Sequence, residues 1–133
     1  MEIRVQHLEG VQFDVSARDH RARCDQPAEF GGSDSGMTPP EFLLAALGTC
    51  AGYYALQYLK LHSLSSQGLE VAVSADKVKA PARMDHFRIE VTAPSIEERH
   101  EAGLLRAVDQ CLIRNTLLNA PSVETVVRTC AAV

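Results

Sequence analysis

The stretch GGSDSGMTPPEFLLAALGTC, residues 31–50, decides the fold, because it joins a glycine-rich loop to the start of a long apolar helix. Thr38 stands at an N-cap position, prolines follow it where no amide donor is needed, and Glu41 completes a capping box. This pattern predicts a helix that begins at about Pro39. The loop before it, residues 25–37, is long enough to be functional, although a solvated linker has the same composition.

The predicted helix is apolar on every side from Phe42 to Leu56 and turns polar at Gln57 and Lys60. We expect such a helix to be buried all round. Its fully apolar part is shorter than the ~20 residues that cross a bilayer, which favours a core helix over a membrane span. Small residues recur along it every three to four positions, and we expect them to admit a second central helix, such as that of a symmetry-related copy. They are Ala45, Gly48, Gly52 and Ala55.

Segments that alternate apolar and polar residues lie on both sides of this helix, which is the pattern of half-buried strands. Residues 1–24 predict two or three short strands, with turns near Gly10 and at Arg18–His20. Farther along, residues 69–75 and 86–92 predict a hairpin.

The C-terminal third predicts a second helix and a last strand. Ser95 is expected to cap that helix, and Cys111 falls on its apolar face and is expected to point to the core. Residues 123–129 alternate as a strand. The order of elements predicts one α+β domain over residues 1–133, with antiparallel sheets around a long central helix.

Charge and composition exclude several function classes. The chain has 133 residues, a formal net charge of -4, only 5% aromatic residues and no basic run, so we expect no nucleic-acid partner. No charged-then-apolar signal segment follows Met1, and we expect a cytoplasmic protein without a membrane partner.

The four cysteines are the composition feature that bears on function. They form no Cys-x-x-Cys pair, and the histidines at 20, 62, 86 and 100 lack ligand spacing, so we expect no metal. In a reducing compartment most cysteines are buried small hydrophobes and a minority do redox chemistry. Cys24 and Cys130 are expected to be structural strand residues. Burial in an apolar helix would by itself make Cys50 inert.

Two segments resemble one known family. The glycine-rich loop, the Thr-Pro start and the Leu/Ala-rich helix with a small residue just before Cys50 closely resemble the OsmC/Ohr family of osmotically inducible and organic hydroperoxide resistance proteins. The run CLIRNTL, residues 111–117, is similar to the second cysteine segment of that family. The expected order of strands and helices agrees over nearly the whole chain.

The resemblance implies an intertwined homodimer that reduces organic hydroperoxides, with active sites at the subunit interface. It makes Cys50 the peroxidatic cysteine and Cys111 the resolving cysteine. The Cys50 thiolate would become a sulfenic acid, and Cys111 would condense with it to a disulfide. No bound cofactor is expected; an external dithiol protein, of the lipoyl type in many family members, would reopen the disulfide.

The family activates its thiolate with an arginine that a glutamate orients. Residues 17–21, Ala-Arg-Asp-His-Arg, are similar to an early family turn, which makes Arg18 the candidate cation. Arg21 and Arg23 are rivals, and a solvated surface position explains all three equally well. Glu41 matches the family's glutamate, but the capping box alone also explains it.

Three departures from the family pattern indicate a divergent branch. Glu41 precedes Cys50 by nine residues, where the best-characterised branches have ten. Nine residues span roughly 13.5 Å and end half a turn out of phase, so Glu41 would act from the other subunit unless the helix bends at Gly48. Met37 and Leu112 stand where prolines are frequent.

Two other functions compete with the peroxidase. In the first, the same dimer is catalytically silent and holds a small hydrophobic ligand at the subunit interface, with the cysteines as packing residues. In the second, the dimer is structural and protects a partner.

Overall fold

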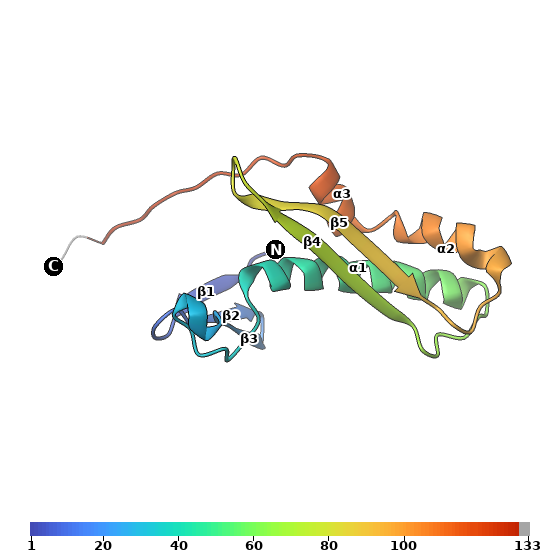
Figure 1. Cartoon of the computed structure of the whole chain (residues 1–133), viewed down its shortest axis with the longest axis horizontal. Coiled ribbons are helices and arrows are strands. Elements are labelled where there is room, and N and C mark those ends of the chain that lie inside the picture. The colour runs from blue at the N-terminus through green and yellow to red at the C-terminus, as the bar shows by residue number, and fades with distance from the viewer. Residues whose placement is uncertain (131–133) are drawn as a thin grey trace.

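The computed structural model describes residues 1–130, which form two small antiparallel sheets and three α-helices. In chain order the elements are β1 Arg4–His7, β2 Phe13–Ala17, β3 His20–Cys24, a 3-10 turn Ala28–Phe30, α1 Pro39–Leu61, β4 Glu70–Val78, β5 Arg83–Thr92, a second 3-10 turn Glu98–His100, α2 Glu101–Val108 and α3 Leu112–Leu118. Strands β1, β2 and β3 form one sheet near the N-terminal end of α1, and the β4–β5 hairpin crosses α1 (Figure 1).

Helix α1 begins at Pro39, as the capping pattern predicts. The Thr38 backbone N–H and hydroxyl donate to Glu41 Oε1 over 3.0 Å and 2.7 Å. These bonds satisfy a donor that the first helical turn would otherwise leave without a partner.

The expectation that α1 is buried all round is wrong for the single chain. Leu47, Ala51, Ala55 and Leu59, each four residues from the next, are buried, whereas the Tyr53 side chain on the other face is 58% exposed. Neighbouring elements cover only one side of the helix, because β4, β5 and α2 all pack there. By length and composition α1 is also the one helix within residues 1–130 that could cross a membrane, a property it shares with the core helices of soluble proteins.

The small-residue stripe of α1 admits a strand of the same chain instead of a second helix. A Cβ at Gly48 would lie 3.0 Å from Val73 Cγ2, and one at Gly52 would lie 3.6 Å from Val71 Cγ2. Both valines belong to β4, so the glycines let the hairpin approach the helix closely. Within one chain the neighbour at this stripe is therefore a strand and not the expected helix, and a helix of a second copy stays a prediction.

The predicted hairpin is confirmed, with longer strands. Val71 pairs with Val91 and Val73 with Ile89 in the antiparallel register of β4 and β5. The hairpin residues Val71, Ile89 and Val91 pack against the core cluster. This cluster consists of Ala51 and Ala55 of α1 and Leu104 and Val108 of α2.

The second helix is broken where the sequence predicts continuity. Helix α2 ends at Val108 and α3 starts at Leu112, with Cys111 between them as the N-cap of α3. Asp109 follows α2 directly. Its carboxylate is repelled by the partial negative charge at the C-terminal end of the helix, which favours ending α2 there. Ser95 does not cap this helix: its hydroxyl donates to the Gln67 carbonyl over 3.3 Å.

The predicted last strand, residues 123–129, is wrong for the single chain. This segment runs out extended from α3 without regular structure (Figure 1). Val123 and Val127 are more than 80% exposed, because no sheet edge of the same chain pairs with the segment. A strand needs a partner for its backbone hydrogen bonds, and the alternating pattern does not supply one.

The loop between β3 and α1 is built around one buried carboxylate and is not a solvated linker. Asp25 is fully buried and accepts bonds from the Gln26, Ser33 and Ser35 backbone N–H groups and the Ser35 hydroxyl. These bonds, those of Ser35 foremost, lower the pKa of Asp25 to about 2. A Cβ at Gly36 would collide with the Arg23 carbonyl, which explains one glycine of the loop. The loop thus has a structural role in fixing the chain before α1.

Candidate thiol site

Two cysteines meet where α1 passes the start of α3. Cys50 is half-buried in the middle of α1, and Cys111 is completely buried as the N-cap of α3. Each thiol shifts the pKa of the other, which places the two sulfurs near one another. The two cysteines that the resemblance pairs therefore lie near one another, and their catalytic roles stay a prediction. Cys111 lies at a helix junction and not on a helix face.

The surroundings of Cys50 favour its thiolate. Burial by itself would raise the pKa of Cys50. Hydrogen bonds from the Ile113 backbone N–H, the Cys111 thiol and the Leu112 backbone N–H outweigh burial and lower the pKa below the ordinary cysteine value. Hydrogen-bond donors near a cysteine sulfur favour its thiolate over its thiol.

The neighbouring Cys111 shifts in the opposite direction. Burial is the main cause that raises the pKa of Cys111, and the hydrogen bond and negative charge of Cys50 raise it further. The Arg114 backbone N–H, which lies 3.5 Å from Cys111 Sγ, opposes this but does not cancel it. These opposite directions favour ionisation of Cys50 over that of Cys111.

We expect iodoacetamide to label Cys50 with a pH midpoint below that of an ordinary cysteine, and Cys111 with a midpoint above it. The thiolate is the reacting form, so the labelling rate follows ionisation. Replacing Cys111 by alanine removes one donor and should raise the Cys50 midpoint. Peptide mass spectrometry across a pH series measures both, and equal midpoints for the two cysteines would contradict the assignment.

Arg18 lies in the exposed turn between β2 and β3, in the sheet near the N-terminal end of α1 (Figure 1). Within residues 1–130, no hydrogen bond or ion pair involves its side chain, and no arginine side chain contributes to the pKa of Cys50. The rival Arg21 pairs with Asp14 over 3.2 Å. A single copy of the chain therefore does not bring the predicted cation to the thiolate.

Glu41 serves as the helix cap. Its bonds from Thr38, the backbone N–H first, lower the pKa of its carboxyl. Glu41 is exposed on the first turn of an unbroken α1, nine residues before Cys50. The capping role is confirmed, and the catalytic role stays a prediction that requires a second subunit.

The remaining cysteines differ from each other. Cys24 ends β3, is buried, and bridges to Met37 across the loop, as expected of a structural residue. Cys130 is exposed and lies in no strand, so its expected packing role is wrong. In the described part of the chain, no cluster of three metal-ligating side chains occurs.

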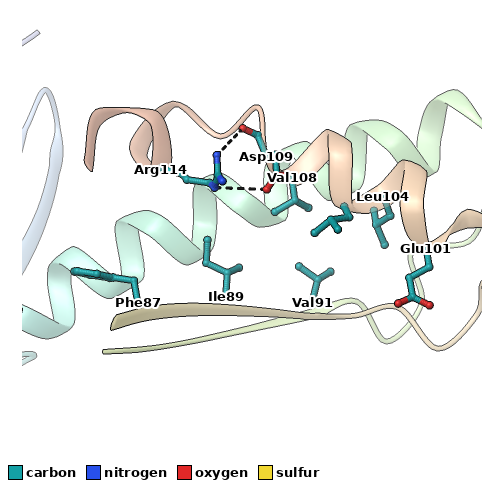
Figure 2. Close-up of a pocket in the computed structure, with 9 residues that line it drawn as sticks. Phe87, Ile89, Val91, Glu101, Leu104, Val108, Asp109 and Arg114 are labelled. Carbon is teal, nitrogen blue, oxygen red and sulfur yellow. Dashed lines mark hydrogen bonds and ion pairs between the residues drawn. The ribbon is translucent and has the colours of Figure 1, made fainter. Parts of the chain in front are cut away.

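Sequence reasoning missed Arg114 and Asp109. The Arg114 side chain reaches back over Cys111, with Nε 3.5 Å from Asp109 Oδ1 and Nη1 3.4 Å from the Asp109 carbonyl (Figure 2). The sequence predicted one continuous helix through this region and therefore did not indicate this contact. The sequence signal was the acidic residue and the basic residue on either side of a buried cysteine.

Arg114 also lines two adjoining clefts. One of about 380 Å³ lies between β5 and α2, with Ile89, Val91 and Leu104 among its walls (Figure 2). The other, about 460 Å³, shares Ile89 and Arg114 and extends to Leu118. Apolar and charged side chains line both clefts, with Glu101 and Asp109 in the first and Asp85 and His86 in the second.

Comparison with solved structures shows that this fold occurs in other proteins. The chain has the fold of a Psychrobacter arcticus protein assigned to osmotic stress induction and detoxification response, at 13% identity and a TM-score of 0.77 over 86% of this chain and 85% of that one. An OsmC-like protein from Mycoplasma pneumoniae gives 17% and 0.74 over 90% and 87%. An organic hydroperoxide resistance protein OsmC from Legionella pneumophila gives 13% and 0.62 over 90% of both chains.

A sequence comparison with curated proteins finds no match. The family model described as OsmC-like protein matches residues 32–126, which is more than half of the chain and includes both Cys50 and Cys111. The chain therefore belongs to the OsmC-like protein family.

Proposed function

We propose that this protein is a thiol-dependent peroxidase that reduces organic hydroperoxides, with Cys50 as the peroxidatic and Cys111 as the resolving cysteine. The observation that carries the proposal is that α1, with Cys50, packs against α3, which Cys111 caps, and that the two cysteines shift each other's pKa in opposite directions. A peroxidase of this type needs one sulfur ionised and a second sulfur within reach of it. The names of fold relatives, which include organic hydroperoxide resistance proteins, support the same class.

The reaction has three balanced steps. The Cys50 thiolate attacks the distal oxygen of the hydroperoxide, the O–O bond breaks, and the alcohol leaves after protonation, which forms a Cys50 sulfenic acid. The Cys111 sulfur then displaces the sulfenic hydroxyl, and water and a disulfide form. An external dithiol is oxidised as it reduces this disulfide, which restores both thiols.

The clefts beside Arg114 offer apolar wall for an organic substrate. Leu47, three residues before Cys50 on α1, and Ile89 line the cleft that extends to Leu118, and Arg114, whose backbone N–H bonds to the Cys111 sulfur, lines both clefts. Burial of an alkyl group against that wall would stabilise a bound organic hydroperoxide, whereas hydrogen peroxide has no alkyl group to bury.

A homodimer completes the proposal. The uncovered face of α1 carries Tyr53 and Leu61, and the extended C-terminal segment exposes Val123 and Val127. A second copy that covers these apolar groups would be stabilised by their burial. The second copy would also bring Arg18 or Glu41 to a thiol site that holds neither in one chain. Four unpaired cysteines fit a reducing cytoplasm, where we place the reaction.

The deciding experiment treats the reduced protein with one equivalent of cumene hydroperoxide. We expect two thiols to be lost and a Cys50–Cys111 disulfide to appear in the peptide map. In a Cys111→Ala variant, dimedone should instead trap a sulfenic acid on Cys50, because the resolving step is missing. A wild-type protein that keeps all its thiols would rule the peroxidase out.

A catalytically silent dimer that binds a hydrophobic ligand is the second candidate, and the two clefts favour it. It requires a ligand that stays with the protein on purification and is found by native mass spectrometry, together with thiols that do not react with the hydroperoxide.

A further inference from the structure

Three ring side chains meet where the end of α1 lies beside the start of α2 (Figure 1). Tyr58 is in the last turn of α1, His62 is the C-cap residue of that helix, and His100 is the N-cap residue of α2. The ring centroid of Tyr58 lies 4.2 Å from that of His62 and 6.0 Å from that of His100, and the two histidine centroids lie 5.7 Å apart. Sequence spacing did not indicate this cluster, because the two histidines come from different helices.

The cluster is held in place by a hydrogen bond and by a glycine. The Tyr58 hydroxyl and His100 Nδ1 are hydrogen-bonded over 2.9 Å. A Cβ at Gly103 would collide with the Tyr58 hydroxyl, so an alanine there would displace the phenol from His100. Glycine in a helix costs about 1 kcal/mol relative to alanine. In α2 this cost is offset by the close approach that fixes the His100 ring.

The two imidazole rings are close enough to bind one metal ion. With metal–nitrogen bonds of about 2.1 Å, the centroids of two imidazoles on one ion lie up to roughly 6.5 Å apart. The observed 5.7 Å between His62 and His100 falls within this limit. When His100 Nδ1–H donates to the Tyr58 oxygen, the Nε2 lone pair of His100 is free for a metal. A partner on the second ring nitrogen is what fixes the tautomer and orientation of metal-binding histidines.

The charges around the two rings favour a cation. His62 stands at the C-terminal end of α1, where the helix dipole is negative. Residues 97–101, which surround His100 in the chain, contain three glutamates and one arginine. Lys60, in the last turn of α1, is the basic residue that opposes them there.

We propose that His62 and His100 bind one transition-metal ion of the class that prefers imidazole, such as Ni²⁺, Cu²⁺ or Zn²⁺, with solvent in the remaining positions. Tyr58 is a positioning residue for His100. The bound ion ties the end of α1 to the start of α2. This site is separate from the thiol pair, because His62 follows Cys50 by twelve residues, roughly 18 Å along the helix.

The test is isothermal titration of the reduced full-length protein with Ni²⁺, which binds imidazole and, unlike Cu²⁺, does not oxidise thiols. We expect one site per chain in the wild type. Tyr58→Phe should weaken Ni²⁺ binding about tenfold, the effect of losing a group that orients a ligand, and His62→Ala and His100→Ala should each weaken it further. Ni²⁺ should also raise the Tm of the wild type and leave that of both histidine variants unchanged, because only an ion bound to the folded chain stabilises it.

His86→Ala and Cys130→Ser are the controls. His86 is an exposed imidazole that pairs with Asp76 over 3.4 Å, and Cys130 is an exposed thiol, so both variants should bind Ni²⁺ as the wild type does. Absence of saturable wild-type binding below about 1 mM Ni²⁺, or binding that survives in both His62→Ala and His100→Ala, would overturn the inference. Hydroperoxide turnover does not enter this test, so failure of the metal site and failure of the proposed function are distinguishable.

Discussion

Cys50→Ser is expected to abolish hydroperoxide consumption, with a fall of about three orders of magnitude or more relative to wild type. Serine keeps the size and the neighbours of the residue, but its hydroxyl does not ionise near neutral pH. The Ile113 and Leu112 amides that stabilise a thiolate would then face a neutral group. The measurement is the loss of cumene hydroperoxide in the presence of excess dihydrolipoamide.

Cys130→Ser is the control for this substitution. Cys130 is an exposed thiol outside the pair, so its loss should leave turnover unchanged. Comparable losses in both variants would indicate nonspecific thiol chemistry, and full activity in Cys50→Ser would refute the assigned nucleophile.

Leu59→Ala should give the largest loss of stability among single core substitutions in α1. Leu59 has no exposed surface, and it is one of the largest fully buried side chains. Truncation removes buried methyl groups and leaves a cavity, which costs about 2–5 kcal/mol of the free energy of unfolding. Urea denaturation at a fixed protein concentration measures the change.

Leu61→Ala offers the matched comparison on the same helix. Leu61 is 81% exposed, so the same truncation should change the free energy of unfolding by no more than about 0.5 kcal/mol in a single chain. A large loss at Leu61 would show that its face is covered in solution, which the proposed dimer would explain. A small loss at Leu59 would contradict the core described here.

Local signals predicted the parts of this fold that depend on neighbouring residues. The Thr38–Glu41 capping box fixes the start of α1 within a few residues of chain, and alternation in residues 69–75 and 86–92 suffices for a hairpin. Both patterns act over short sequence distances.

Features that depend on distant partners could not be predicted in this way. A mostly apolar composition does not say which side of α1 the hairpin covers, and an alternating segment at 123–129 has no strand to join in one chain. The split between α2 and α3 was missed because no glycine or proline marks it. The roles of Ile113 and Leu112 follow only from that split.

The sequence indicated which two cysteines form the candidate site, but not which groups lower the pKa of Cys50. The resemblance paired Cys50 with Cys111, and the structure places them where α1 packs against the start of α3. It assigned thiolate stabilisation to Arg18, whereas in one chain backbone amides supply it. Every residue except proline has a backbone N–H, whatever its side chain, so a sequence motif does not indicate which amides act on Cys50.

The placement of Cys111 between two helices has a mechanical consequence for the redox cycle. A disulfide requires the two Cα atoms to approach within about 7 Å with suitable dihedral angles. A cysteine inside a helix could adjust its backbone only by breaking the ladder of the surrounding turns. At a junction, φ and ψ of Cys111 can rotate so that α3 moves as an intact rod while α2 stays in place. Each catalytic turn would then flex one joint of the chain and leave the core cluster of Leu104 and Val108 undisturbed.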